Sequence, residues 1–179
     1  MDRESILKQA KRHMFKQGKH GPLVFIKTND QEYCLPINDT DRFNISVLDR
    51  EKVLFIAGRD FAQRESIADE SILALYFVQE FWFVWRGLEE IDKVQRPSKE
   101  PDRRECLGVI ELLIDLKQHS VEQNFYRSEI LRHGDIINLG PSELAEEVQS
   151  NLLTCFLTGV ASARYNDREF ESAIQRYTQ

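Results

Sequence analysis

The segment from Ser71 to Trp85 constrains the fold more than any other part of this chain. It reads SILALYFVQEFWFVW and is apolar or aromatic at nearly every position. Both alternating sets of side chains are apolar, which is typical of a strand buried on both faces. The run carries Gln79 and Glu80 and is shorter than the roughly 20 residues of a membrane-spanning helix. It therefore predicts a central strand, covered by a helix on one face and by a helix or a second subunit on the other, and no membrane segment.

Length and charge narrow the class of protein. A chain of 179 residues is expected to form a single α+β domain over residues 1–164. The polar stretch 165–179 would be a tail or a short docking helix carrying Phe170, Ile174 and Tyr177. The net charge of −6 argues against broad contact with a phosphate backbone. Nucleic acid is therefore not an expected partner.

The three cysteines, Cys34, Cys106 and Cys155, lie far apart and are odd in number. That pattern is neither a disulfide framework nor a zinc motif. Each cysteine has apolar neighbours, so all three are predicted to be buried free thiols. Reduced cysteines, together with an N-terminus that lacks an apolar signal core, predict a cytoplasmic protein.

Hydrophobic periodicity and turn residues predict the order of elements. The predicted elements are a helix after Asp2, a hairpin that turns at Asn29–Asp30, a helix from Val47 to about Arg64, strands over 72–85, 105–117 and 121–131, and a helix capped by Ser142. The order α-β-β-α-β-β-β-α predicts a single, mostly antiparallel sheet of about five strands packed by helices. Profilin-like folds, including longin and roadblock modules, share this alternation.

The apolar content also predicts self-association. Two residues of the last helix, Leu153 and Leu157, fall outside its main apolar stripe. One sheet and three helices cannot readily cover so many large apolar side chains on both faces. Large apolar patches that stay exposed usually mark interfaces. Symmetric dimers are the commonest outcome. A homodimer through the last helix or the outer face of the sheet is the expectation.

A polar loop follows the apolar run. Glu80-x-Trp82 is succeeded by the string PSKEPDRRE over residues 97–105. This combination resembles an uncharacterised family of small prokaryotic proteins, in which an E-x-W strand is followed by a P-S-x-x-P-D-R-x-E loop. The resemblance covers residues 20–135, and Phe81 stands where the family pattern has a small residue. It implies a similar layout of hairpin and second helix, and no activity.

The loop is the best candidate site. Pro97 and Pro101 restrict the backbone, and Arg103 and Arg104 have the fork geometry that binds carboxylate or phosphate. The arginines would either pair with neighbouring acids or bind an external anion, and both interpretations stay open. Glu80 would pair with this loop, lie at an open strand end, or act as an acid or metal ligand. The candidate binding residues are Glu80, Ser98, Asp102, Arg103, Arg104 and Glu105.

The sequence contains no strong catalytic motif. Pro101-Asp102 followed by Asp115-Leu116-Lys117 matches a nuclease string, but its two acids would lie about 40 Å apart along one strand. The histidines are dispersed, and no catalytic residue, metal or cofactor is predicted. The sequence thus favours a non-catalytic interaction or ligand-binding module for an unknown protein or a small anionic ligand. The alternative is a metal-dependent hydrolase or nuclease using Asp102, Glu80 and Arg103.

Overall fold

A computed structural model describes residues 2–17, 21–37, 47–83, 103–115, 117–118, 120–134, 136–145 and 150–165. Its helices are α1 (Arg3–Gln17), α3 (Val47–Glu65), α4 (Leu152–Ser162) and the short 3-10 turn η1 (Asp69–Ser71). Its strands are β1 (Leu23–Thr28), β2 (Glu32–Pro36), β3 (Ile72–Phe83), β4 (Arg104–Asp115), β5 (Ser120–His133), β6 (Ile136–Leu139) and β7 (Glu143–Leu144).

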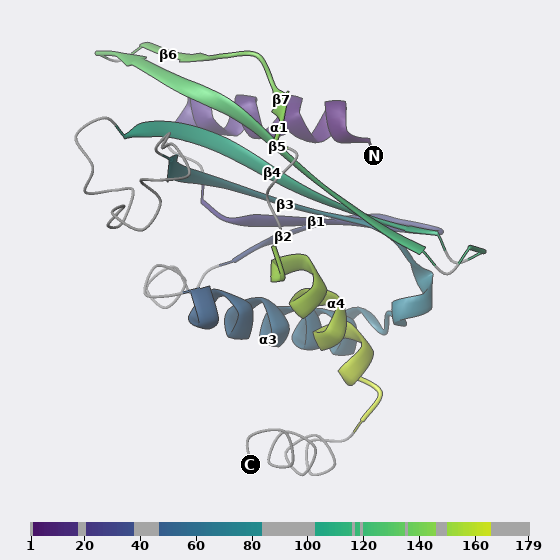
Figure 1. The fold of residues 1–179 in the computed structure, drawn as a ribbon. Helices are drawn as coiled ribbons and strands as arrows, with labels where there is room; N and C mark the ends of the chain where they lie inside the picture. The colour runs from purple at the N-terminus through teal and green to yellow at the C-terminus, as the bar shows by residue number, and fades with distance from the viewer. Residues whose placement is uncertain are drawn as a thin grey trace, which may run out of the picture.

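The strands form one antiparallel sheet in the order β2-β1-β3-β4-β5-β6, and β7 also pairs with β5. Helix α1 lies on one face of this sheet, and α3 and α4 lie on the other (Figure 1). The predicted α+β class and the antiparallel sheet are confirmed. The sheet has seven strands rather than about five, because β6 and β7 follow the turn at Gly134 as short pieces with little sequence signal.

Local sequence explains the first elements. The Asp2 carboxylate accepts a hydrogen bond from the Ser5 amide at 2.8 Å and so caps α1. The predicted hairpin forms between β1 and β2, and Pro36 ends β2 at the edge of the sheet, where the missing N–H of proline is tolerated.

Strand β3 lies between β1 and β4 and divides the core in two. Leu75 and Phe77 point toward α3 and α4, whereas Tyr76 and Val78 point toward α1. All four side chains are buried, as the apolar run predicts. The expectation is wrong at the far end of the strand, where Trp82 is 42% exposed, because it lies beyond Val78, the last β3 residue of the core on the α1 face.

Helices α3 and α4 cross in close contact through two glycines. A Cβ on Gly58 would overlap the carbonyl of Phe156, and a Cβ on Gly159 would overlap the carbonyl of Phe55. The buried Arg59 guanidinium then donates to the Ser162 carbonyl at 2.7 Å. Glycine is required at both positions because the two backbones meet without a side chain between them.

The last helix differs from its prediction. It begins at Leu152, not after Ser142, because Glu143–Leu144 pairs with β5 as β7. Leu153 is fully buried and Leu157 packs against the core, so the apolar surface proposed for a dimer on this helix is mostly used within the chain. Phe170, Ile174 and Tyr177 lie outside the described residues.

The cysteines are all free, as predicted, but Cys34 is exposed and Cys155 only partly buried. Cys34 is exposed because it lies on the edge strand β2, where side chains have fewer neighbours. Within the part of the chain that the structure describes, no helix is long and apolar enough to cross a membrane.

The close contact at Gly58 and Gly159 predicts the sign of the stability change when either glycine is replaced by alanine. Gly→Ala at an exposed helical position stabilises a protein by about 1 kcal/mol through helix propensity. Gly58→Ala and Gly159→Ala should instead lower the free energy of unfolding by about 1–3 kcal/mol, because the new methyl group overlaps backbone. Denaturant unfolding measures the change. Ile56→Ala, at an exposed position of α3, is the control and should stay within about 0.5 kcal/mol. A stabilised Gly58→Ala variant would show that the helices cross farther apart.

Candidate functional site

The end of the sheet where β3 leaves and β4 begins brings together the described candidate residues. Trp82 pairs with Glu105, and Glu80 pairs with Leu107. Glu80 is therefore a diagonal neighbour of Glu105, two positions along the ladder. Of the predicted binding residues, Glu80, Arg103, Arg104 and Glu105 gather at this end, whereas Ser98 and Asp102 lie outside the described residues.

Strand alternation divides these residues between two faces. Glu80, Trp82 and Glu105 lie on the α1 face, because each is in register with that face's core positions. Arg104 and Cys106 lie on the opposite face, the one that carries α3 and α4 farther along the sheet. The candidate residues thus form two separate arrangements rather than one cleft.

A charged cluster of three residues lies on the α1 face. Arg132, from β5, donates from Nε to Glu105 Oε2 at 2.7 Å and from Nη2 to Glu105 Oε1 at 2.8 Å. Its Nη2 is also 3.8 Å from Glu80 Oε1. These bonds raise the pKa of the Arg132 guanidinium above its ordinary value, first through the hydrogen bond to Glu105 and then through the charges of Glu105 and Glu80. Glu80 is thus held by an arginine that the sequence analysis did not single out.

An exposed aromatic side chain borders this cluster. The Arg103 guanidinium carbon is 5.1 Å from the centre of the Trp82 ring, within cation–π distance. Arginine and tryptophan are enriched at binding hot spots. Their positions make this rim suited to contact with another molecule.

The opposite face holds a hollow of about 260 Å³, here named the β4–β5 hollow. Its lining residues are Arg104, Cys106, Arg127, Glu129, Leu131, Gly140, Pro141 and Glu143. Arg104 is 3.3 Å from Glu129, and Arg127 is 3.7 Å from Glu143. Two guanidiniums from neighbouring strands therefore face the same space, each beside one carboxylate. The chain from β6 to β7 closes one side of it.

The buried Cys106 thiol belongs to the lining of this hollow. Burial, followed by the charge of Glu129, raises its pKa to about 12. The thiol therefore stays neutral at physiological pH and is a poor nucleophile. The hollow has a binding surface of mixed charge but no activated sulfur.

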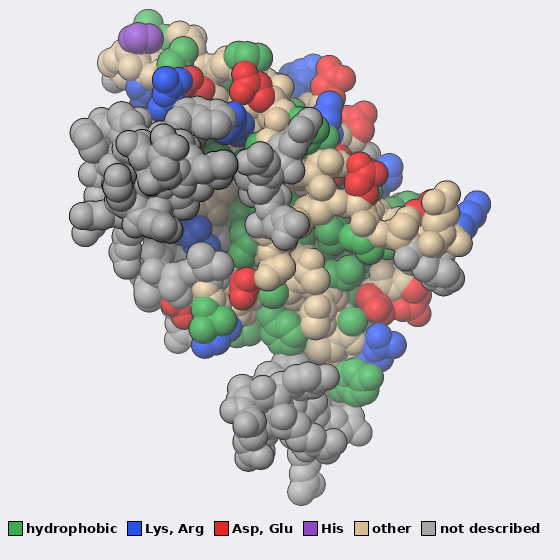
Figure 2. Space-filling model, viewed as in Figure 1, with side chains coloured by type: hydrophobic (Ala, Val, Ile, Leu, Met, Phe, Trp, Pro, Cys, Tyr) green, Lys and Arg blue, Asp and Glu red, His purple; other side chains and the backbone are tan. Residues whose placement is uncertain are grey.

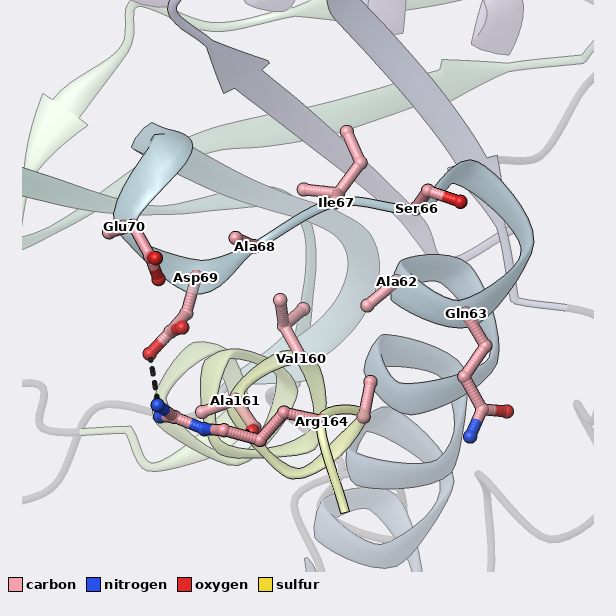
Figure 3. Close-up of a pocket in the computed structure, with 11 residues that line it drawn as sticks. Ala62, Gln63, Ser66, Ile67, Ala68, Asp69, Glu70, Val160, Ala161 and Arg164 are labelled. Atoms are coloured by element: carbon pink, nitrogen blue, oxygen red, sulfur yellow. Dashed lines mark hydrogen bonds and ion pairs between the residues drawn. The ribbon is translucent and has the colours of Figure 1, made fainter. Parts of the chain in front are cut away.

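A second hollow, of about 460 Å³, lies where the ends of α3 and α4 meet η1. Figure 3 shows that its walls are mostly small side chains, such as Ala62 and Ala161, and that Arg164 reaches across to Asp69. Their contact measures 3.4 Å. Every lining residue lies outside the set that the sequence predicted, and the alanine-rich helix ends gave no signal for it.

A buried carboxylate was also missed. Glu111 is 6% exposed and accepts hydrogen bonds from Asn124 at 3.2 Å and Tyr126 at 3.5 Å. Burial, and then the charge of Glu111, raises the pKa of Tyr76. The alternation of β4 places Glu111 between Val109 and Leu113 on the α1 face and could have revealed its burial.

Metal chemistry finds no support in the described residues. Over the ranges given above, no group of three His, Cys, Asp or Glu side chains is placed to hold a metal ion. Strand β4 runs unbroken from Arg104 to Asp115, so Asp115 lies at the opposite end of this strand from Arg104. Asp102 itself is outside the described residues.

Comparison of the chain with protein-family models, with curated proteins and with solved structures finds no match.

The Arg132 cluster should contribute measurably to stability. Arg132→Gln removes a bidentate partner and leaves two carboxylates close together, so we expect the free energy of unfolding to fall by about 1–2 kcal/mol. Arg104→Gln breaks a single, more exposed ion pair and should cost less than about 1 kcal/mol. Urea unfolding at low salt compares the two. Equal losses would mean that the bidentate geometry adds nothing.

The cysteines should differ in reactivity. Cys34 is exposed, whereas Cys106 is buried and has a pKa of about 12. Iodoacetamide at pH 8, followed by mass spectrometry, should label Cys34 and leave Cys106 unmodified until denaturant is added. Because the pKa of Cys106 is raised in the folded state, its stabilising effect is present below pH 9 and is lost as the pH rises toward 12. Rapid native labelling of Cys106 would contradict its burial.

Proposed function

We propose that this protein is a non-catalytic binding module that takes a small anionic ligand in the β4–β5 hollow. One observation carries the proposal: Arg104 and Arg127, from adjacent strands, line the same space of about 260 Å³. This volume is near the lower limit of small-molecule sites. A carboxylate or phosphate placed there would meet two guanidiniums at once.

The chemistry of the hollow suits binding rather than turnover. Guanidinium forks bind carboxylate and phosphate through paired hydrogen bonds. Glu129 and Glu143 hold the arginines in place through contacts of 3.3 and 3.7 Å, which a stronger anion would replace. Their negative charges also favour a ligand that carries an ammonium group beside its anion. A neutral Cys106 supplies no nucleophile.

The wider charge pattern agrees with a small ligand. On the face shown in Figure 2, acidic and basic side chains of the described residues are interspersed. A nucleic-acid surface would instead gather positive charge along a stripe. We also propose, on the free cysteines and the apolar content, that the protein works in the cytoplasm as a homodimer.

An NMR titration tests the ligand site. Adding inorganic phosphate or succinate at low salt should shift the backbone amides of residues that line the hollow. Arg127→Gln and Arg104→Gln should each weaken binding by about 10-fold or more, because each removes a charged hydrogen bond worth about 1.5–3 kcal/mol. Salt should weaken binding as well.

Arg164→Gln is the matched control. Arg164 is exposed and paired with Asp69 at 3.4 Å, much as Arg104 is paired with Glu129, but it lines the other hollow. Its loss should leave the shifts unchanged. Shifts that survive Arg127→Gln, or that follow Arg164, would overturn the assignment.

A further inference from the structure

Strand β6 forms one edge of the sheet, and its outer side is paired with no described strand. Figure 1 shows β6 along the outermost border of the sheet. It is a run of four uncharged residues, Ile-Ile-Asn-Leu, followed by Gly140 and Pro141. An edge strand presents a row of backbone donors and acceptors that readily pair with another chain.

The opposite edge is protected in ways that β6 is not. Strand β2 begins at a charged residue, Glu32, and ends at Pro36. Charged residues and proline on an edge strand discourage pairing with another sheet. Strand β6 has neither within its length.

Exposed apolar side chains lie on and beside the unpaired edge strand β6. Ile136 is 63% exposed and Leu131, on the neighbouring strand, is 43% exposed. Strand pairing joins Leu131 to Asn138 and His133 to Ile136, so both exposed apolar residues lie on the face of the β4–β5 hollow. On the α1 face, Ile137 and Leu139 are half-buried against the core. The edge therefore offers both unpaired backbone and apolar surface.

We infer that β6 pairs antiparallel with β6 of a second copy of this chain, a step that rests on the proposed homodimer and names its surface. A strand with no charged side chain meets its own copy without placing like charges opposite each other. Pairing around a two-fold axis would join the two sheets into one continuous sheet. The like faces of the two copies would lie on the same side, α1 beside α1.

Strand geometry restricts the register. Directly opposite residues of an antiparallel pair point to the same face, and alternate residues of β6 point to opposite faces. The two-fold axis must therefore pass through a residue position. An axis at Ile137 places Ile136 opposite Asn138 of the second copy and pairs residues 136–138 of the two strands. Three-residue pairing buries less than a standard interface of about 1,600 Å², so the dimer should dissociate on dilution.

Analytical ultracentrifugation across a dilution series tests the surface. The wild-type chain should form a dimer at high micromolar concentration, and Ile136→Lys should shift its dissociation constant upward by at least about 10-fold, because a lysine on an edge strand opposes pairing with another chain. Ile136 is mostly exposed, so the variant should keep the wild-type melting temperature. Cys34→Lys on the other edge, β2, is the control and should dimerise as the wild type does.

Disulfide trapping tests the register. In a Cys34→Ser background, Ile136→Cys with Asn138→Cys should give a covalent dimer on mild oxidation, since the two positions face each other across the axis. The matched pair on β2, Glu32→Cys with the native Cys34, should stay monomeric.

A wild-type chain that is monomeric throughout would overturn the inference. So would a folded Ile136→Lys variant that still dimerises, or covalent dimers formed equally by the β2 pair. None of these three results would alter anion binding in the β4–β5 hollow, so failure of this interface and failure of the ligand site can be distinguished.

Discussion

Burial of β3 on both faces is the constraint on which the other elements depend. A strand with apolar side chains on both sides needs cover above and below, and α1 provides one layer while α3 and α4 provide the other. Within the second layer, Gly58 and Gly159 let the backbones of α3 and α4 touch. The core on the α1 face ends along β3 at Val78. The candidate residues Glu80, Arg104 and Glu105 lie beyond that point, where β3 pairs with the start of β4.

The central elements could be predicted because their signals are local and strong. The aromatic run, the Asn29–Asp30 turn and the helix from Val47 identified β3, the first hairpin and α3. The last helix was placed too early, because Ser142 resembles a cap while Glu143–Leu144 gains its structure only by pairing with β5. Two-residue strands depend on distant partners, so sequence periodicity carries little information about them.

The candidate site was only partly predictable, for a related reason. Glu80, Arg103, Arg104 and Glu105 are close in sequence to the ends of β3 and β4, and their gathering follows from one antiparallel pairing. Arg132 and Arg127 come from β5, and their roles depend on the register between β4 and β5. A one-residue slip would exchange the faces on which they lie. Sequence alone does not fix that register, so the partner of Glu80 and half of the hollow were missed.

The contact between Arg59 and the end of α4 has a consequence for local opening of the fold. Arg59 donates hydrogen bonds to the carbonyls of Ser162 and Tyr165, which a free helix end would leave to water. An arginine of α3 therefore caps the end of α4, and the crossing glycines join the two backbones close to that end. The amide hydrogens of α3 and α4 should therefore exchange with solvent as one cooperative unit. Helix α1 is held mainly through Ile6 and Ala10, so it should open separately and with a lower free energy of opening.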